Sequence, residues 1–383
     1  MSFRAGTQNE QRQATTIRNR LLRWYDPHRR QLPWRNTSDP YRIWVSEVML
    51  QQTRAQAVIP YYEKFLERFP DVKTLAATYE PSLLSCWSGL GYYSRARNLR
   101  QAAQTIVREH EGCFPRDLPA ALELPGVGDY TARAVLSIAY RIPLPVLDGN
   151  VARVLSRLYA CGANPRSTPG KKKLLQLADT LLARKRPGDF NQALMELGAT
   201  VCVPRQPRCP ACPLRRYCQA YLRNQVTSYP VSRTKSPLKV RRFLAALILD
   251  GRERCLLARR PPEANWMAGF WELPLWEVSS QEANSRNRHN RENRSDRQNR
   301  YSRFNRKEGI ILGGLLGRLR HSITTNRIEV AVYEGRLARR PLARTEKWAR
   351  LDQIEYLPIT TITRKALALQ SSIHVDALRQ SFL

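Results

Sequence analysis

Four cysteines within seventeen positions constrain this chain more than any other feature of its sequence. Cys202, Cys209, Cys212 and Cys218 have the spacing C-x6-C-x2-C-x5-C, and prolines stiffen the segments between them. Four thiolates held so close together can form a closed site for zinc or for an iron–sulfur cluster, and the spacing leaves that choice open. Four unligated thiols are the simpler alternative, but the crowding argues against it.

The remaining cysteines are scattered, so a disulfide framework is not expected. They lie in apolar stretches, and we expect small core residues at Cys86, Cys113, Cys161 and Cys255. One metal or cluster site together with isolated thiols is typical of a reducing compartment.

The charge of the chain indicates a polyanionic partner. It contains 64 Lys and Arg against 32 Asp and Glu, a formal net charge of +32. The partner could be nucleic acid or an anionic membrane surface. The longest apolar run, Phe243–Leu249, is too short to span a bilayer, and the N-terminus lacks the apolar core of a secretory signal. These features favour nucleic acid, no membrane association and a cytoplasmic location, at the nucleoid of a bacterium.

Apolar spacing divides the chain into two predicted domains. Residues 15–222 have mostly helical periodicity, and 223–237 form a predicted linker. Residues 238–383 contain alternating patterns that predict strands at 243–250, 254–260 and 327–333. Within this second domain, residues 279–308 are rich in Asn, Arg and Ser. Such a segment cannot bury a core, so we expect a disordered basic insertion.

Two carboxyl groups have surroundings that suggest acid–base chemistry. Asp39 and Pro40 predict a helix start, and the helix that follows places Glu47 among apolar residues. Desolvation there would raise the Glu47 pKa, and a neutral carboxyl can donate a proton, although a solvated helix face is the simpler interpretation. Asp148 precedes another helix and could be only its N-cap. Gly149 would instead let the chain bend and direct the carboxylate outward.

A glycine-containing hairpin lies between two predicted helices, 119–123 and 129–140. The segment Leu124–Gly128 reads Leu-Pro-Gly-Val-Gly. Its two glycines would allow backbone N–H groups to approach a phosphate at a helix N-terminus. An ordinary turn between helices is the alternative, and the basic chain with its cysteine cluster favours the phosphate-binding interpretation.

Several motifs together resemble one enzyme superfamily. Residues 30–222 resemble the helix-hairpin-helix DNA glycosylases that carry an iron–sulfur cluster, the superfamily of endonuclease III. Besides the cysteine spacing, the resemblance rests on LPWR (32–35), SEVMLQQT (46–53), GLGYYSRARNL (89–99), LPGVGDYTA (124–132) and LDGNVARV (147–154). Within that superfamily the details are similar to the adenine DNA glycosylase (MutY) family. Endonuclease III has a catalytic lysine where this chain has Tyr130, so the resemblance implies a monofunctional glycosylase without an efficient lyase step.

The resemblance implies a role for each of several residues. The cysteines would hold a [4Fe-4S] cluster. Glu47 would protonate adenine, and anionic Asp148 would stabilise the positive charge on the sugar, with Tyr130 and Asn150 positioning the acids and the water. Expected DNA contacts are the hairpin residues Gly126, Val127 and Gly128 and the wedge residues Gln52 and Tyr92. The expected adenine pocket comprises Arg30, Leu32, Trp34, Arg35 and Gln192.

The second domain resembles the Nudix-like C-terminal domain of the same family, which recognises 8-oxoguanine. The resemblance rests on LLARRPP (256–262) and GFWELP (269–274). A glutamate-rich hydrolase motif is absent from the sequence, so binding without hydrolysis is expected. Where the family has a Phe-Ser-His turn, this chain has Thr324 and Thr325, and we expect Thr324 to reach the oxidised base.

The sequence thus predicts a mostly helical glycosylase domain joined to a smaller α+β Nudix-like domain. The expected substrate is double-stranded DNA with adenine opposite 8-oxoguanine or guanine, and the expected state is a monomer. A thymine or uracil mismatch glycosylase, or an endonuclease III-like enzyme, is one alternative. A non-catalytic iron–sulfur protein that binds damage or senses redox state is another.

Overall fold

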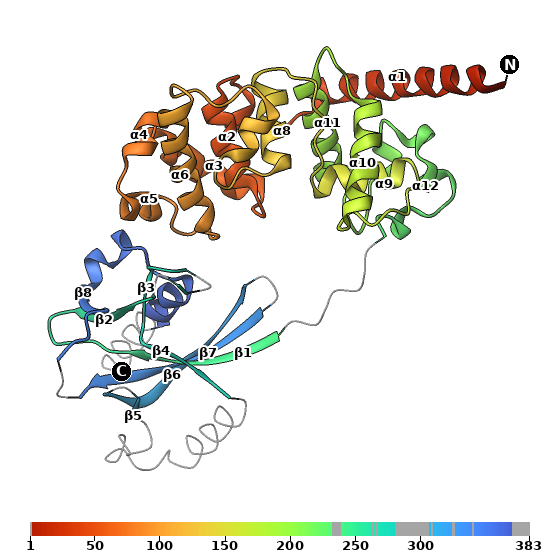
Figure 1. Cartoon of the computed structure of the whole chain (residues 1–383). Helices are drawn as coiled ribbons and strands as arrows, with labels where there is room; N and C mark the ends of the chain where they lie inside the picture. Colours follow the sequence, from red (N-terminus) through yellow and green to blue (C-terminus); the bar gives the residue numbers. More distant parts are fainter. Residues whose placement is uncertain are drawn as a thin grey trace. The chain divides into compact units, whose positions relative to one another are not determined.

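The computed structural model describes residues 2–231, 239–261, 263–264, 267–279, 306–307, 309–323, 326–338 and 341–369. The chain divides into two compact units (Figure 1). The first comprises Met1–Glu80 and Tyr93–Thr234, and the second comprises Pro81–Tyr92 and Lys235–Leu383. None of the described helices is both long enough and apolar enough to cross a membrane.

The first unit is helical, as the periodicity of residues 15–222 predicts. Its first helix begins earlier than expected, at Ser2. The helices are α1 (Ser2–His28), α2 (Pro40–Leu50), α3 (Ala55–Arg68), α4 (Val72–Ala77), α6 (Ser94–Glu109), α7 (Leu118–Glu123), α8 (Asp129–Ala139), α9 (Gly149–Leu158), α10 (Thr168–Leu181), α11 (Pro187–Thr200) and α12 (Gln219–Leu222), with the 3₁₀ turn η1 at Pro33–Arg35. Helix α5 (Glu80–Cys86) begins at the boundary between the units.

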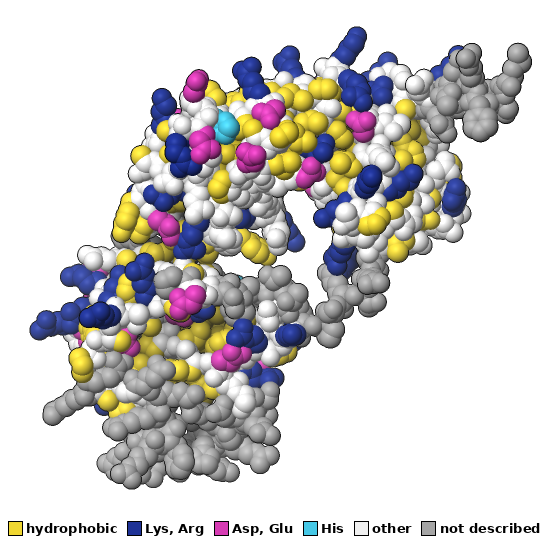
Figure 2. All heavy atoms as spheres, viewed as in Figure 1, with side chains coloured by type: hydrophobic (Ala, Val, Ile, Leu, Met, Phe, Trp, Pro, Cys, Tyr) yellow, Lys and Arg dark blue, Asp and Glu magenta, His cyan; other side chains and the backbone are white. Residues whose placement is uncertain are grey.

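The core of the helical unit forms where α1, α9, α10 and α11 meet. Leu21 of α1, Leu155 of α9, Leu174 of α10 and Phe190 of α11 have no exposed side-chain surface and belong to one apolar cluster. Burial of such side chains contributes about 1.5 to 3 kcal/mol each to folding. Figure 2 shows Lys and Arg side chains spread over the face of this unit, in keeping with the basic sequence.

The predicted glycine hairpin joins α7 to α8. Gly126 has a φ of +74°, a conformation that favours glycine. A Cβ atom at this position would lie 2.6 Å from the Cβ of Asn98 on α6. Gly128, the N-cap of α8, has an ordinary φ of −89°, and a Cβ there would meet no atom within 4 Å. Only the first of the two glycines is therefore required by the fold.

The second unit contains two sheets. One has the strand order β4-β1-β7-β6-β5 and the other β3-β2-β8. Strands β1 and β7 run parallel, whereas the other pairs are antiparallel. The strands are β1 (Lys239–Leu247), β2 (Arg254–Arg259), β3 (Trp271–Glu272), β4 (Leu275–Val278), β5 (Arg306–Lys307), β6 (Ile310–Ile323), β7 (Asn326–Leu337) and β8 (Glu346–Arg350), followed by the 3₁₀ helix η6 (Leu351–Tyr356) and a helix over 361–369. The predicted strands at 243–250, 254–260 and 327–333 correspond to β1, β2 and β7, which confirms an α+β second region.

Some sequence predictions are wrong, and others fall on residues outside the described ranges. The predicted insertion, 279–308, ends too late, because Arg306 and Lys307 pair with β6 as strand β5. Several predicted positions lie outside the described residues: 280–305 and 308 of the insertion, 232–237 of the linker predicted at 223–237, and Thr324 with Thr325. Cys86 and Cys255 are buried as expected and Cys161 is partly buried, but Cys113 is exposed, so its assignment to the core was wrong.

The hairpin gives a stability prediction with an internal control. Gly126→Ala would force a left-handed conformation on alanine and press its methyl group against Asn98. We expect a loss of about 2 to 4 kcal/mol of unfolding free energy, from backbone strain and overpacking together. Gly128→Ala changes only an N-cap and should cost about 1 kcal/mol or less. Urea unfolding followed by circular dichroism at 222 nm measures both, and equal losses would contradict this account of the turn.

Candidate active site

Helix α2 carries Glu47 into the interior, as its apolar neighbours predict. The Asp39 carboxylate accepts a hydrogen bond from the Tyr41 backbone N–H at 2.9 Å, and Pro40 occupies the first turn, so the helix begins where the sequence predicts. Residues on nearly every side of the helix are buried, including Ile43 and Val48. Glu47 is only 5% exposed, so the alternative of a solvated helix face is wrong.

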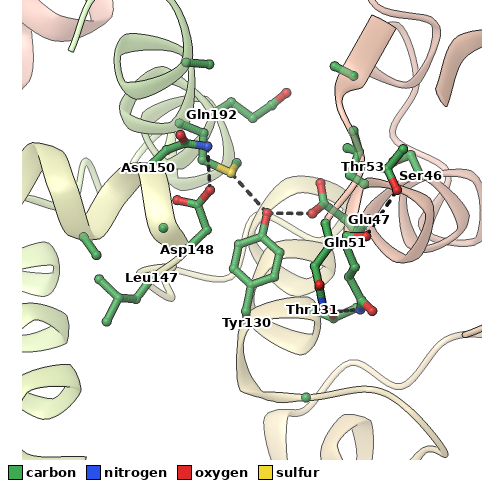
Figure 3. A pocket seen from close by; sticks show the side chains of 18 of the residues that line it. Ser46, Glu47, Gln51, Thr53, Tyr130, Thr131, Leu147, Asp148, Asn150 and Gln192 are labelled. Atoms are coloured by element: carbon green, nitrogen blue, oxygen red, sulfur yellow. Dashed lines mark hydrogen bonds between the residues drawn. The ribbon is translucent and has the colours of Figure 1, made fainter. Parts of the chain in front are cut away.

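The Glu47 carboxyl has one hydrogen-bonding partner of note, Tyr130 on α8. The Tyr130 hydroxyl donates to Oε2 of Glu47 at 2.7 Å (Figure 3). Burial raises the pKa of Glu47 to about 7. The hydrogen bond from Tyr130 opposes that rise, and the negative charge of Asp148 adds to it. A carboxyl with this pKa retains a proton in neutral solution in a substantial fraction of molecules, so it can act as a proton donor.

Asp148 is an N-cap and also faces the cleft, so its two expected roles coexist. One carboxylate oxygen accepts from the Val151 backbone N–H at 2.7 Å, and the other accepts from the Asn150 side-chain amide at 2.8 Å. Burial raises the pKa of Asp148, while these hydrogen bonds and the charge of Arg153 oppose the rise. The hydrogen bonds thus favour an ionised carboxylate at the N-terminus of α9.

Helix α11 supports the segment that carries Asp148. A Cβ atom at Gly198 would lie 2.7 Å from the Cβ of Asn150, so the two chains pack directly. Arg153 donates to the Asn150 side-chain oxygen at 2.8 Å and to the Cys202 carbonyl at 2.7 Å. One arginine therefore joins the Asp148 segment to the start of the cysteine loop.

A single cleft of about 1620 Å³ brings most of the predicted site residues together. In Figure 3, Tyr130 lies between Glu47 on α2 and Asp148 before α9. The cleft is lined by Glu47, Tyr130, Asp148 and Asn150, by the hairpin residues Gly126 and Gly128, by Gln52, and by Arg30, Leu32, Trp34, Arg35 and Gln192.

Two predicted residues do not line this cleft. Val127 is 5% exposed, and its backbone N–H already donates to the Leu124 carbonyl at 3.0 Å. Tyr92 belongs to the second unit and is 43% exposed. Gln52 and Tyr92 both have left-handed φ angles, 58° and 50° respectively, which are uncommon for such residues.

The cleft wall contains a buried group of ion pairs that the sequence did not predict. Glu196 on α11 accepts hydrogen bonds from Arg30 at 2.7 Å and from Arg35 at 2.7 Å, and its side chain is fully buried. Burial raises its pKa, but the hydrogen bonds and charges of the two arginines outweigh burial and hold the pKa at about 2. Glu196 lies one helical turn after the predicted Gln192, and that spacing is the signal in the sequence that could have found it.

The four cysteines lie on a compact loop against the helical core. Cys202, Cys212 and Cys218 pack against the apolar cluster of the first unit, and the loop turns through η2 (Cys209–Ala211) and η3 (Arg215–Tyr217). The almost fully buried Arg157 donates to the Val203 and Pro204 carbonyls, both at 2.8 Å, and lies 3.4 Å from the Cys202 sulfur.

The cysteine thiols are close enough to affect one another electrostatically. Burial raises the pKa of the Cys209, Cys212 and Cys218 thiols, and the charge of Cys202 contributes to each rise. Across the described ranges, however, no group of three or more His, Cys, Asp or Glu side chains is arranged to hold a single metal ion.

Comparison with known proteins shows similarity to DNA repair enzymes. Residues 45–180 match the family described as HhH-GPD superfamily base excision DNA repair protein. The adenine DNA glycosylase of Mus musculus is 48% identical over 220 residues, which cover 55% of this chain and 43% of the mouse protein. That of Buchnera aphidicola subsp. Baizongia pistaciae is 37% identical over 251 residues, covering 65% of this chain and 71% of the relative.

A solved structure is also similar to the helical part. A thermostable thymine-DNA glycosylase aligns with a TM-score of 0.52 and 31% identity, over 57% of this chain and 99% of that protein. The chain spans less than half the length of the mouse, Arabidopsis, human and rat relatives that it matches.

The buried acid gives a prediction about stability and pH. Because the folded-state pKa of Glu47 is about 7 and the ordinary value is 4.5, the folded protein retains a proton that the unfolded chain has released. Stability should therefore fall as pH rises from about 4.5 to 7, by an amount on the order of 3 kcal/mol from this group. Glu47→Gln removes the titration, so its stability relative to the wild type should increase over that range.

Chemical denaturation at several pH values measures this difference. Glu67→Gln, at an exposed glutamate on α3, is the matched control and should follow the wild-type curve. A Glu47→Gln curve parallel to the wild type at every pH would contradict the raised pKa.

Proposed function

This chain belongs to the adenine DNA glycosylases of the HhH-GPD superfamily, and from that premise we propose that it excises adenine from mispaired DNA. The reaction would hydrolyse the bond between the base and its deoxyribose. The observation that carries the proposal is the pair of carboxyls, buried Glu47 and partly buried Asp148, that flank Tyr130 in one cleft (Figure 3). Two carboxyls with different surroundings are what such hydrolysis requires.

In the proposed mechanism, the target nucleotide first leaves the stack and enters the cleft. Glu47 then donates its proton to a ring nitrogen of adenine, and the base departs with the electrons of the glycosidic bond. The sugar becomes cationic, and the Asp148 carboxylate stabilises that charge. Water adds to the sugar and gives up a proton, which restores the acid form of Glu47.

Neighbouring side chains would keep the two carboxyls in their roles. The Tyr130 hydroxyl holds Glu47 in place, and the Asn150 amide with the N-terminus of α9 favours ionised Asp148. Tyr130 has no amine, so it cannot form an imine with the opened sugar. We therefore propose a monofunctional glycosylase.

Exposed cations around the cleft support DNA as the partner. Arg54, Arg166, Lys171 and Lys172 line the cleft with exposed side chains. Phosphate contacts of this kind supply sequence-independent affinity that weakens with salt. The hairpin at Gly126–Gly128 would bind the backbone, and Gln52 and Tyr92 would act as wedges during extrusion. Leu32, Trp34 and Gln192 would contact the adenine, with Arg30 and Arg35 shaping the wall through Glu196.

We propose a [4Fe-4S] cluster at Cys202, Cys209, Cys212 and Cys218. Clustered, half-buried thiols beside the buried guanidinium of Arg157 suit thiolate ligands, because a positive charge compensates theirs. A bound cluster would supply structural cross-linking of the loop.

We propose that the second unit is a Nudix-like domain that recognises the base opposite the adenine. The α+β architecture of this unit supports the proposal, and within it β6 pairs antiparallel with β7 from Ile310 and Leu337 to Ile323 and Asn326. The proposed substrate is therefore adenine opposite 8-oxoguanine or guanine. Because the helical part is also similar to a thymine-DNA glycosylase, excision of thymine is an alternative that the same assay tests.

An excision assay on four duplexes tests the proposal. Single-turnover rates would be measured with A opposite 8-oxoguanine, A opposite G, T opposite G and U opposite G. We expect release of adenine from the first two only, with a rate that falls as pH rises above about 7, because Glu47 must be protonated. Glu47→Gln should lower the rate by about 10² to 10⁴-fold and leave DNA binding intact.

The wild type and Glu67→Gln serve as references in this assay. Excision of thymine in place of adenine would overturn the proposed specificity. A Glu47→Gln variant that retains the wild-type rate would remove Glu47 from the chemistry.

The metal content of the purified protein tests the cluster. We expect about four irons per chain and a brown colour, both lost in Cys209→Ser. The exposed Cys113 provides the matched control, because Cys113→Ser should keep the iron. Stoichiometric zinc without iron in a fresh preparation would contradict the proposal.

A further inference from the structure

Arg95 on α6 is an almost fully buried cation placed at the C-terminal end of α2. Its Nη1 atom lies 2.9, 2.8 and 2.7 Å from the carbonyl oxygens of Val48, Met49 and Gln51. Only 8% of the residue is exposed. The last carbonyls of a helix have no partners within the helix and carry partial negative charge, so a guanidinium there satisfies and stabilises them.

The segment that these hydrogen bonds hold leads directly into the cleft. Gln51 accepts from Arg95 through its carbonyl, and its side-chain amide donates to the Thr131 hydroxyl on α8 at 3.3 Å. Gln52 comes next, exposed and with a φ of 58°. A left-handed backbone at such a residue costs about 1 to 3 kcal/mol and persists only where neighbouring contacts enforce it. The contacts on both sides of Gln51 provide that enforcement.

Glu47 lies in the last turn and a half of the same helix. Arg95 therefore fixes where α2 ends relative to both the acid and the cleft-facing segment 51–53. Because its three short hydrogen bonds are to backbone carbonyls, Arg95 acts on Glu47 through the backbone of α2.

We propose that Arg95 is a positioning residue that sets the placement of segment 51–53 relative to Glu47, and thereby couples extrusion of the base to its protonation. This inference rests on the proposed adenine glycosylase function. Without the guanidinium, the end of α2 would relax and Gln52 would leave its left-handed conformation. Misplacement of a positioned group by about 1 Å can lower a rate by roughly 10²-fold.

Arg100 provides a matched control on the same helix. Its Nε donates to the Thr78 carbonyl at 2.6 Å, at the C-terminal end of α4, which carries no predicted site residue. Arg95→Met and Arg100→Met thus both remove an arginine that binds helix-terminal carbonyls. Arg95→Met removes the contacts at the C-terminal end of α2, whereas Arg100→Met removes the contact at the C-terminal end of α4.

The test uses the full-length protein and three readouts: DNA affinity, single-turnover excision of adenine opposite 8-oxoguanine, and the fluorescence of 2-aminopurine placed at the adenine position. Fluorescence reports unstacking of the base independently of cleavage. Arg95→Met should lower the excision rate by about tenfold or more and reduce the fluorescence rise, with little change in affinity. Arg100→Met should lose comparable thermal stability while keeping the wild-type rate and fluorescence.

Arg95→Lys tests the geometry of the contact. An ammonium keeps the charge but lacks the planar fork, so we expect a rate and a fluorescence rise between those of Arg95→Met and the wild type. If Arg95→Met does not fold, the excision rate and fluorescence of Arg95→Lys alone test the inference. Wild-type excision and fluorescence in the folded Arg95 variants, or an equal loss in Arg100→Met, would overturn the inference. Absence of adenine excision by the wild type would instead overturn the proposed function, and the fluorescence would still test Arg95.

Discussion

The hydrogen bond from Tyr130 to Glu47 is the interaction on which the rest of the site depends. It joins α2 to α8 across the cleft, and it gives a buried carboxyl its partner. A carboxylate removed from water is costly unless hydrogen bonds or opposite charges compensate. Here the hydrogen-bonding partner is a neutral hydroxyl, and burial outweighs both that hydrogen bond and the charge of Arg35, so the Glu47 pKa rises to about 7. The fold thus keeps a proton on Glu47, the residue that donates one in the proposed mechanism.

Two other carboxyls of the cleft, Asp148 and Glu196, have hydrogen-bond donors that favour their ionised forms. Asp148 is partly buried, and the backbone N–H of Val151 and the Asn150 amide both donate to it. Glu196, deeper in the wall, has two arginines and remains charged. The three carboxyls in one cleft therefore have different partners: a hydroxyl for Glu47, amide and backbone N–H groups for Asp148, and two arginines for Glu196. Arg153 extends this arrangement to the cysteine loop, which would make the loop a support for the catalytic segment.

Features encoded by nearby residues could be predicted from the sequence. The cap at Asp39, the apolar helix around Glu47, the hairpin at Gly126 and the main strands each follow from spacing within a few residues. Pairings between distant segments could not be predicted in this way. Arg30 and Glu196 are 166 residues apart, and Arg95 and Val48 are 47 apart. Exposure of Cys113 and the short strand β5 likewise depend on packing, because local composition favoured a core residue and a disordered segment there.

The most direct measurement of the central claim is the titration of Glu47 itself. Protein labelled with ¹³C at the glutamate side-chain carboxyl carbons, compared with Glu47→Gln to assign the resonance, gives the pKa of this one group by NMR. A midpoint near 7 in the DNA-free protein is the result that this account predicts. A midpoint near the ordinary value of 4.5 would mean that the fold does not hold a proton on Glu47, and it would contradict the account.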